Sequence, residues 1–285
     1  PDKTGEEIFA RYKDFDRRFG QPHHVHWLAH TNPPRDGRRL KVGYVSPDFR
    51  HHACSFFMEP LLANHDAAVV DVYAYAELTH EDGVSQRYKR YVEHWVPTRG
   101  MSDTALAQRI RADGIDILVE LAGHTSGNRL GVFARKPAPV SISWMGYGYT
   151  TGLQAIDYYL TDAVSVPEGS DHLFSELPWR LKDVSLVAYR ASPGMGDVSP
   201  LPALERGYIT LGTLTRGVRI NHHTIRVWVA LLHRLPTAHI VIDSSSFKDS
   251  AVQQAMVNNF VAQGISAERL HIGFESPPWN VLRGI

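Results

Sequence analysis

A short polar segment carries the densest set of side chains that could do chemistry. Between Ser46 and Ser55 the sequence reads SPDFRHHACS, so an aspartate, an arginine and two histidines fall within five positions. Histidine has a free pKa near neutral and suits proton transfer, and the N–H groups that open the following helix favour an anion. The alternative is a solvated polar loop in which Asp48 caps that helix.

Two glycine-rich segments could approach a ligand closely. They read GHTSGNR from Gly123 to Arg129 and WMGYGYTTG from Trp144 to Gly152. Glycine lets the backbone come near a ligand, and aromatic rings suit stacking against a sugar or a base. We expect His124 to point into the same crevice. The alternatives are an ordinary turn with positive φ angles and an aromatic-rich loop that covers the core.

A fourth segment, TLTRGVR from Thr213 to Arg219, combines two threonines with Arg216 and Arg219. Arginine side chains at the end of a strand suit phosphate contacts, because the guanidinium group can donate two parallel hydrogen bonds. The alternative is a solvated basic turn.

Other well-known site patterns are missing from the sequence. The His-rich run at His23, His24 and His26 has no carboxylate nearby, and H-E-x-x-H, Walker, G-x-S-x-G and complete G-x-G-x-x-G motifs do not occur. We therefore expect no metal. A single cysteine excludes an internal disulfide and a Cys-rich zinc site and fits a reducing compartment, and Cys54 is expected to pack.

The elements that must position these segments alternate between strands and helices. Predicted strands are Arg39–Ser46, Val69–Ala76, Ile115–Leu121, Val140–Met145 and Asp157–Thr161, and predicted helices are Cys54–Asn64, Glu81–Glu93, Asp103–Ala112 and Arg129–Lys136. Apolar strands separated by helices indicate an α/β fold with a parallel sheet covered on both faces. Ligands of such sheets bind outside the C-terminal ends of the strands, where the polar and glycine-rich segments begin.

The chain divides into four predicted regions. Residues 1–38 are a helix over 1–20 that Gly20 ends, then a polar linker, and residues 39–184 are a Rossmann-like lobe. Residues 185–206, rich in Ser, Pro and Gly, are a connection. Residues 207–285 resume the alternation, with strands at Tyr208–Gly212, His239–Ile242 and Leu270–Gly273 and helices at Thr224–Arg234, Asp249–Gln263 and Trp279–Arg283. Because a doubly wound domain needs roughly 100 residues or more, this region is expected to be half of a second lobe.

Composition excludes several classes of protein. The 285 residues include 30 Lys+Arg and 30 Asp+Glu, so the charge balance argues against a general nucleic-acid binder. With 43% hydrophobic and 21% charged residues the chain can build a packed core. The sequence has no apolar run long enough to cross a membrane and no signal pattern at its start. We expect a cytoplasmic protein without membrane or nucleic-acid partners.

Taken in order, these segments resemble a known family. The runs LKVGYVSPDFRHHACSFF, DGIDILVELAGHTSGNRLGVFARKPAPVSISWMGYGYTTG and DYYLTD are similar to the catalytic region of the O-linked N-acetylglucosamine transferases, especially bacterial members. The resemblance covers roughly residues 39–182 and, more loosely, 208–285. It implies two Rossmann-like lobes (the GT-B type), preceded by tetratricopeptide helices. It also implies inverting transfer of N-acetylglucosamine from UDP-N-acetylglucosamine to Ser or Thr hydroxyls of proteins, without a metal.

The resemblance also assigns roles to individual residues. Asp48 and His52 match an Asp and a His that line the sugar pocket, and we expect them to be catalytic. The predicted donor-sugar pocket consists of His124, Thr125, Met145, Gly146 and Tyr147, although Gly148 and Tyr149 depart from the family's usual Pro-Gly. Arg219 matches a diphosphate-binding Lys, with Arg216 just before it.

Three interpretations of function follow. The first is a protein O-N-acetylglucosaminyltransferase, in which either His52 or a donor phosphate is the base. The second is a related transferase with another sugar nucleotide or acceptor, such as an N-glucosyltransferase, and the third is a non-catalytic sugar-nucleotide-binding scaffold. The expected partners are a UDP-sugar, an acceptor protein or peptide and the remaining C-terminal half of the catalytic region, without which the isolated fragment is expected to be inactive.

Overall fold

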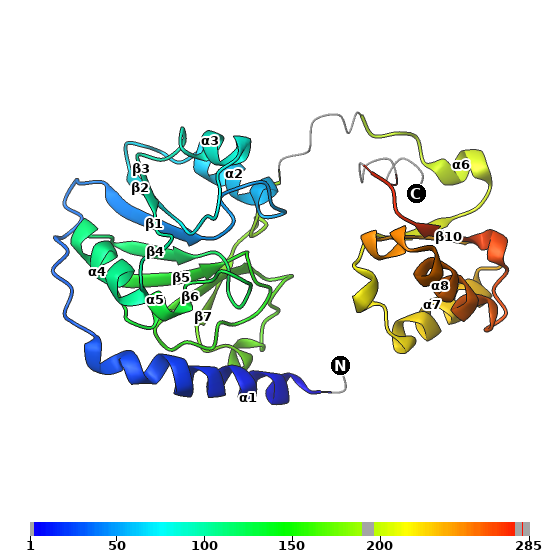
Figure 1. Cartoon of the computed structure of the whole chain (residues 1–285), viewed down its shortest axis with the longest axis horizontal. Coiled ribbons are helices and arrows are strands. Elements are labelled where there is room, and N and C mark those ends of the chain that lie inside the picture. Colours follow the sequence, from blue (N-terminus) through cyan, green and yellow to red (C-terminus); the bar gives the residue numbers. More distant parts are fainter. Residues whose placement is uncertain (1–2, 190–196, 277–280, 282–285) are drawn as a thin grey trace. The chain divides into compact units, whose positions relative to one another are not determined.

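The computed structural model describes residues 3–189, 197–276 and Val281, and it divides the chain into two compact units (Figure 1). The first unit spans residues 1–192 and the second spans residues 193–285. The division lies inside the segment 185–206 that the sequence marks as a connection.

The first unit is built on a parallel sheet of seven strands in the order β3-β2-β1-β4-β5-β6-β7. The strands are β1 Leu40–Ser46, β2 Val70–Ala76, β3 His94–Pro97, β4 Ile117–Glu120, β5 Val140–Trp144, β6 Tyr158–Asp162 and β7 Leu177–Leu181. The strand order reverses between β1 and β4, so this is a doubly wound sheet, and ligands of such sheets bind outside the C-terminal ends of the strands at the reversal. The predicted α/β class and parallel sheet are confirmed.

Two strands of this sheet were not predicted. Both β3 and β7 lie at an edge, and both contain a proline, Pro97 in β3 and Pro178 in β7. An edge strand tolerates proline and exposed side chains because one side of its backbone needs no ladder partner. The continuous apolar runs that reveal buried strands are therefore missing from both.

Helices cover both faces of the sheet (Figure 1). They are α2 Ser55–Ala63 and α3 Gly83–Tyr88 on one face and α4 Asp103–Asp113 and α5 Leu130–Phe133 on the other. Alternation along β2 divides the core, since Val72 and Ala74 pack with α2 and α3 while Tyr73 and Tyr75 pack with α4 and α5. Helix α3 is shorter than the predicted Glu81–Glu93.

The N-terminal helix extends further than its sequence pattern indicates. Helix α1 covers Gly5–Phe15, continues as a π-helical turn over Asp16–Gly20 and then as a 3₁₀ helix over Gln21–His26. The sequence predicted that the helix ends at Gly20 and that a linker follows over 21–38. This prediction was wrong for residues 21–26, which continue as a helix. Gly20 instead makes room for the buried Asp16, whose Oδ1 would lie 2.1 Å from a Cβ atom at that position.

The second unit contains a parallel sheet of three strands in the order β10-β9-β8. Its elements are α6 Pro202–Arg206, β8 Thr210–Thr213, α7 His222–Arg234, β9 His239–Asp243, α8 Ser250–Val261 and β10 Leu270–Gly273. Helix α6 was not predicted and falls within the expected connection. The predicted helix Trp279–Arg283 lies outside the described residues except for Val281. In the described part of the chain, no helix combines the length and apolar character needed to cross a membrane.

Candidate active site

Asp48 organises the loop that follows β1. It is 6% exposed, and its backbone N–H donates to the Oγ of Ser46 over 2.9 Å. Its two carboxylate oxygens face different side chains. Nη2 of Arg50 lies 3.4 Å from Oδ1, and Nδ1 of His52 lies 3.7 Å from Oδ2. The structure thus brings together the Asp48 and His52 side chains that the sequence placed four positions apart.

The hydrogen bonds around His52 determine which of its ring nitrogens carries the proton. The backbone N–H of Cys54 donates to Nδ1 over 3.3 Å, so the neutral ring carries its proton on Nε2. The carbonyl of His52 accepts from the N–H and Oγ of Ser55 at 2.9 and 2.7 Å, which fixes the backbone at the start of α2. The side chain is 37% exposed. His52 can therefore donate a hydrogen bond from Nε2 to a ligand.

Contacts with the start of α3 hold this loop in place. The side chain of Asp82 accepts from the N–H of His51 over 2.7 Å, and the Oγ of Ser85 donates to the carbonyl of Phe49 over 2.7 Å. Partial burial opposes ionisation of Asp82, but the N–H groups of His51, Ser85 and Val84 lower its pKa to about 2. Asp82 is thus a fixed negative charge that ties the loop to α3.

Cys54 lies beside the Asp48–His52 pair. It is 8% exposed and packs in the core between the sheet and α2, as the sequence predicts. Burial and the nearby charge of Asp48 raise the pKa of its thiol to about 11. Because the thiolate is the nucleophilic form, Cys54 is unsuited to nucleophilic catalysis.

The two glycine-rich loops, after β4 and β5, are in contact through their glycines. A Cβ atom on Gly123, whose φ is +52°, would lie 2.2 Å from the Cβ of Tyr147. A Cβ atom on Gly146 would lie 1.6 Å from the carbonyl oxygen of Leu121. Met145, which directly precedes Gly146, adopts a φ of 64°, a strained conformation for a residue other than glycine. Such strain is concentrated at ligand-binding sites, so these loops are candidates for one.

The predicted pocket residues differ in their surroundings. His124 donates from Nε2 to the carbonyl of Thr151 over 2.8 Å, and its ring packs edge-on against Tyr12 and Phe15 of the N-terminal helix. Thr125 donates from Oγ1 to the carbonyl of Ala122. The ring of His124 is thus already bonded within the fold, where we expected it to point into the crevice.

Tyr147 connects the loop after β5 to the N-terminal helix. Its hydroxyl lies 2.5 Å from the hydroxyl of Tyr12, and its carbonyl accepts from the hydroxyl of Tyr159 over 3.1 Å. Both phenols are held by residues distant in sequence, so helix α1 takes part in shaping the candidate pocket.

Glu120, at the end of β4, is a polar residue of this region that the sequence analysis missed. It is 2% exposed, and its Oε1 accepts from the N–H groups of Ala122 and Gly123 at 2.6 and 2.7 Å. Burial raises its pKa to about 7, although these two hydrogen bonds act in the opposite direction. The available signal was a carboxylate that interrupts the apolar run from Ile117 to Ala122. Glu120 fixes the turn that carries Gly123 and His124.

Arg216 and Arg219 belong to the second unit, at the end of β8. Both are exposed, and neither forms an ion pair with any residue that the structure describes. The turn that carries them is fixed by a hydrogen bond from the N–H of Gly217 to the Oγ of Ser244 over 3.1 Å. Both guanidinium groups are available for an anionic ligand.

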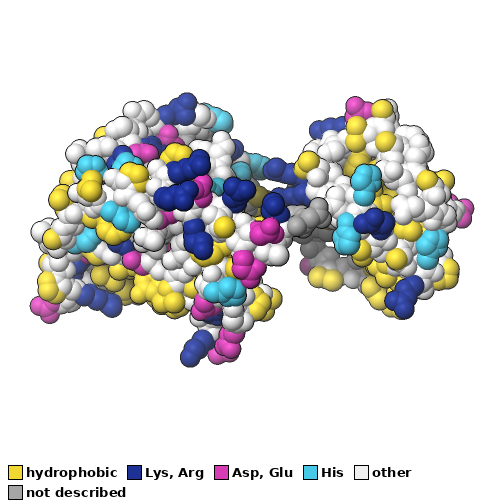
Figure 2. All heavy atoms as spheres, turned by 90° about the horizontal axis from the view of Figure 1, so that it is seen from below, with side chains coloured by type: hydrophobic (Ala, Val, Ile, Leu, Met, Phe, Trp, Pro, Cys, Tyr) yellow, Lys and Arg dark blue, Asp and Glu magenta, His cyan; other side chains and the backbone are white. Residues whose placement is uncertain are grey.

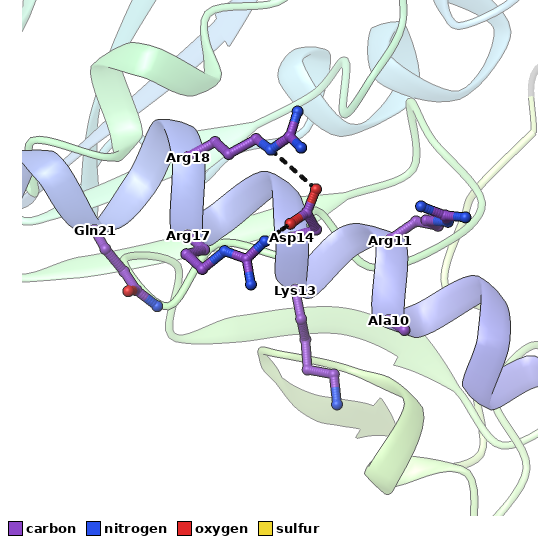
Figure 3. A pocket seen from close by; sticks show the side chains of 7 residues that line it. All are labelled: Ala10, Arg11, Lys13, Asp14, Arg17, Arg18 and Gln21. Atoms are coloured by element: carbon purple, nitrogen blue, oxygen red, sulfur yellow. Dashed lines mark hydrogen bonds and ion pairs between the residues drawn. The ribbon is translucent and has the colours of Figure 1, made fainter.

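A charged hollow lies along α1 and is separate from these loops (Figure 3). Arg17 and Arg18 both pair with Asp14, the latter over 3.0 Å. Figure 2 shows Lys and Arg side chains gathered on one face of the first unit. The hollow is lined by Ala10, Arg11, Lys13, Asp14, Arg17, Arg18 and Gln21. It contains no residue of the predicted catalytic set.

Known proteins resemble the chain over most of its length. The model of a family described as glycosyl transferase family 41 matches residues 20–184. A Solanum lycopersicum protein named "Probable UDP-N-acetylglucosamine--peptide N-acetylglucosaminyltransferase SPINDLY" is 33% identical over 275 residues, which cover 94% of this chain and 29% of that protein. The UDP-N-acetylglucosamine--peptide N-acetylglucosaminyltransferase of Caenorhabditis elegans is 39% identical over 149 residues, which cover 50% of this chain and 12% of that protein.

A solved structure agrees with the fold. A mutant of the Thermobaculum terrenum O-GlcNAc transferase superposes with a TM-score of 0.88 at 28% identity, and the match covers 99% of this chain and 53% of that one. The chain thus spans about half of this structure and less than a third of the tomato relative.

Proposed function

Because the chain belongs to glycosyl transferase family 41, we propose that it is part of an inverting transferase that moves N-acetylglucosamine from UDP-N-acetylglucosamine to Ser or Thr hydroxyls of proteins. The predicted relationship to the O-linked N-acetylglucosamine transferases is confirmed. The names of the relatives support the donor and a peptide acceptor. The observation that carries the proposal is that Asp48 and the half-exposed His52 lie side by side at the C-terminal end of β1.

In the proposed reaction the acceptor oxygen attacks the anomeric carbon of the sugar while the bond from that carbon to the diphosphate breaks. The leaving diphosphate keeps the electron pair and gains negative charge, which hydrogen-bond donors and cations stabilise. His52 donates from Nε2, with its ring held by the backbone N–H of Cys54, and Asp48 holds Arg50 in place. Because Nε2 already carries the proton in this tautomer, a donor phosphate oxygen is the proposed base.

The remaining predicted residues have binding roles in the proposal. Gly146 and Tyr147, with Met145 between strand and loop, form part of the sugar pocket, together with the turn of His124 and Thr125. Arg216 and Arg219 bind the diphosphate. The proposed transfer step uses no metal. A cytoplasmic location and tetratricopeptide helices that precede this region stay predictions.

A panel of sugar nucleotides tests the donor and the acceptor. The full-length gene product is incubated with UDP-N-acetylglucosamine, other UDP-sugars and GDP-sugars, together with Ser, Thr and Asn peptides, and products are read by mass spectrometry. Transfer of N-acetylglucosamine to Ser or Thr is expected. Transfer of another sugar, or to Asn, would replace the proposed specificity, and binding without turnover would favour a scaffold.

Substitution of His52 tests the site. His52→Ala is expected to lower turnover at least tenfold, roughly 1.4 kcal/mol in barrier, while the fold is kept. His51→Ala is the matched control, because its exposed side chain makes none of the contacts found at His52. Equal turnover of the two variants would reject the assignment.

A further inference from the structure

Three potential metal ligands meet beside the proposed catalytic histidine. Asp48, His52 and Cys54 each offer one ligand atom, and these atoms lie within 4.8 Å of one another. A tetrahedral zinc ion with bonds of about 2.0–2.3 Å separates its ligand atoms by roughly 3.3–3.6 Å. The 3.7 Å between Nδ1 of His52 and Oδ2 of Asp48 is close to that range. Small side-chain rotations would complete the set.

Two of the three ligand groups already have partners within the loop. Arg50 contacts Oδ1 of Asp48, so Oδ2 stays available to an ion. Nδ1 of His52 carries a lone pair, as a metal ligand must, and zinc would replace the hydrogen bond that this lone pair accepts from the backbone N–H of Cys54. Cys54 contributes sulfur from within the core.

The chemistry of the set favours zinc. A thiolate, an imidazole and a carboxylate are all zinc ligands, whereas magnesium and calcium prefer oxygen alone. Three protein ligands leave a fourth position for water.

We propose that Asp48, His52 and Cys54 bind a zinc ion and that the bound ion inhibits the transferase. The inhibition rests on the proposed function of His52. To reach zinc, the ring of His52 and the carboxylate of Asp48 must close around the ion. That movement takes Nε2 away from the position in which it would donate to the substrate. The same cluster thus supports transfer when it holds no metal and blocks transfer when it holds zinc.

Cobalt binding provides a direct test that needs no turnover. Cys54 is the only cysteine in the chain, so a sulfur-to-cobalt charge-transfer band reports this site alone. The full-length protein is titrated with Co²⁺, and zinc affinity is measured by competition with a chromophoric chelator. The wild type is expected to show the band, and Cys54→Ser and Cys54→Ala are expected to lack it. Zinc at the His-rich segment 23–26 would give no such band.

Zinc inhibition is measured on the same proteins. Cys54→Ser and Cys54→Ala are expected to keep wild-type transfer in chelator but to need at least about tenfold more zinc for half-inhibition. His51→Ala is the control and should stay as sensitive as the wild type. Absence of the cobalt band, or equal zinc sensitivity in the Cys54 variants, would overturn the proposal. A cobalt band in a protein that transfers no sugar would support the site while rejecting the proposed function.

Discussion

At the scale of single residues, the proton on His52 decides its role. Nδ1 accepts from Cys54, so the ring is a donor at Nε2. A glutamine side chain places an N–H donor near the same point but cannot act as a base. If His52 donates, His52→Gln should keep at least about threefold more turnover than His52→Ala. The comparison is made from kcat on the full-length enzyme, and equally impaired variants would indicate that His52 is the base.

Glu120 is predicted to make stability depend on pH. Burial raises its pKa from 4.5 to about 7, so the folded chain holds this proton more strongly than the unfolded chain. The stabilisation is complete below pH 4.5 and is lost as the pH rises through 7.

The unfolding free energy of the wild type, measured relative to that of Glu120→Gln, should therefore fall by about 3 kcal/mol between pH 4.5 and pH 7. This value follows from 1.36 kcal/mol for each unit by which the pKa is raised. Urea unfolding of both proteins at several pH values measures this. A difference that stays constant with pH would show that Glu120 is ionised in the fold.

At the scale of elements, helix α1 and the loop after β5 form one packed assembly. The carbonyl of Tyr12 would lie 2.5 Å from a Cβ atom on Gly152, whose φ is +82°. The buried Asp16 accepts from the N–H of Gln154 over 3.2 Å. A substitution in the loop therefore disturbs the packing of the helix. In turn, the helix fixes the position of the loop that carries Tyr147.

Two glycines of this loop give a matched pair of variants. Gly152→Ala should lower the unfolding free energy by roughly 1–3 kcal/mol, because it adds both backbone strain and a clash with α1. Gly148→Ala should change it by less than about 0.5 kcal/mol, since nothing lies within 4 Å of its Cβ position. Denaturant melts measure both. Similar losses would mean that α1 does not pack as described.

The turn after β8 is predicted to bind the diphosphate. Arg219 is exposed in this turn, whereas His222 begins helix α7. Arg219→Ala should weaken UDP affinity more than His222→Ala, because only the guanidinium group offers two parallel donors to phosphate. Calorimetric titration of the full-length protein with UDP compares them. Equal losses would show that the residue correspondence in the second unit is misaligned.

At the scale of the whole chain, each unit has its own core. The core of the second unit joins α7 and α8 to its sheet, and Phe260 is completely buried there. Phe260→Ala should cost about 3–5 kcal/mol through the lost contacts and the cavity left behind.

Hydrogen exchange shows which unit loses stability in Phe260→Ala. Amide protection should fall in β8, β9 and β10 and be retained in β1 and β4, which belong to the first unit. Val261→Ala, a change at the neighbouring residue that is 45% exposed, is the control and should leave protection in β9 almost unchanged. Equal loss in both units would contradict separate cores.

The sequence by itself determined the fold class and the position of the candidate site. Strands such as β1 and β4 are buried on both faces, so their apolar runs are visible in the sequence, and parallel pairing then places the loops that follow them at one edge. Asp48 and His52 are local neighbours, which is why their types and spacing were informative. The edge strands β3 and β7 were missed because half-exposed strands with proline lack that signal.

Only the tertiary structure decided which groups face one another. The hydroxyls of Tyr12 and Tyr147 meet across 135 positions of sequence, and no local pattern encodes such a contact. The same holds for Glu120, whose burial becomes apparent only when the neighbouring strand covers it. Within the loop, the sequence supplied Asp48, His52 and Cys54, but backbone geometry decided that Nδ1 accepts and that three ligand atoms converge. Side-chain direction depends on φ, ψ and packing, which are set by the whole fold.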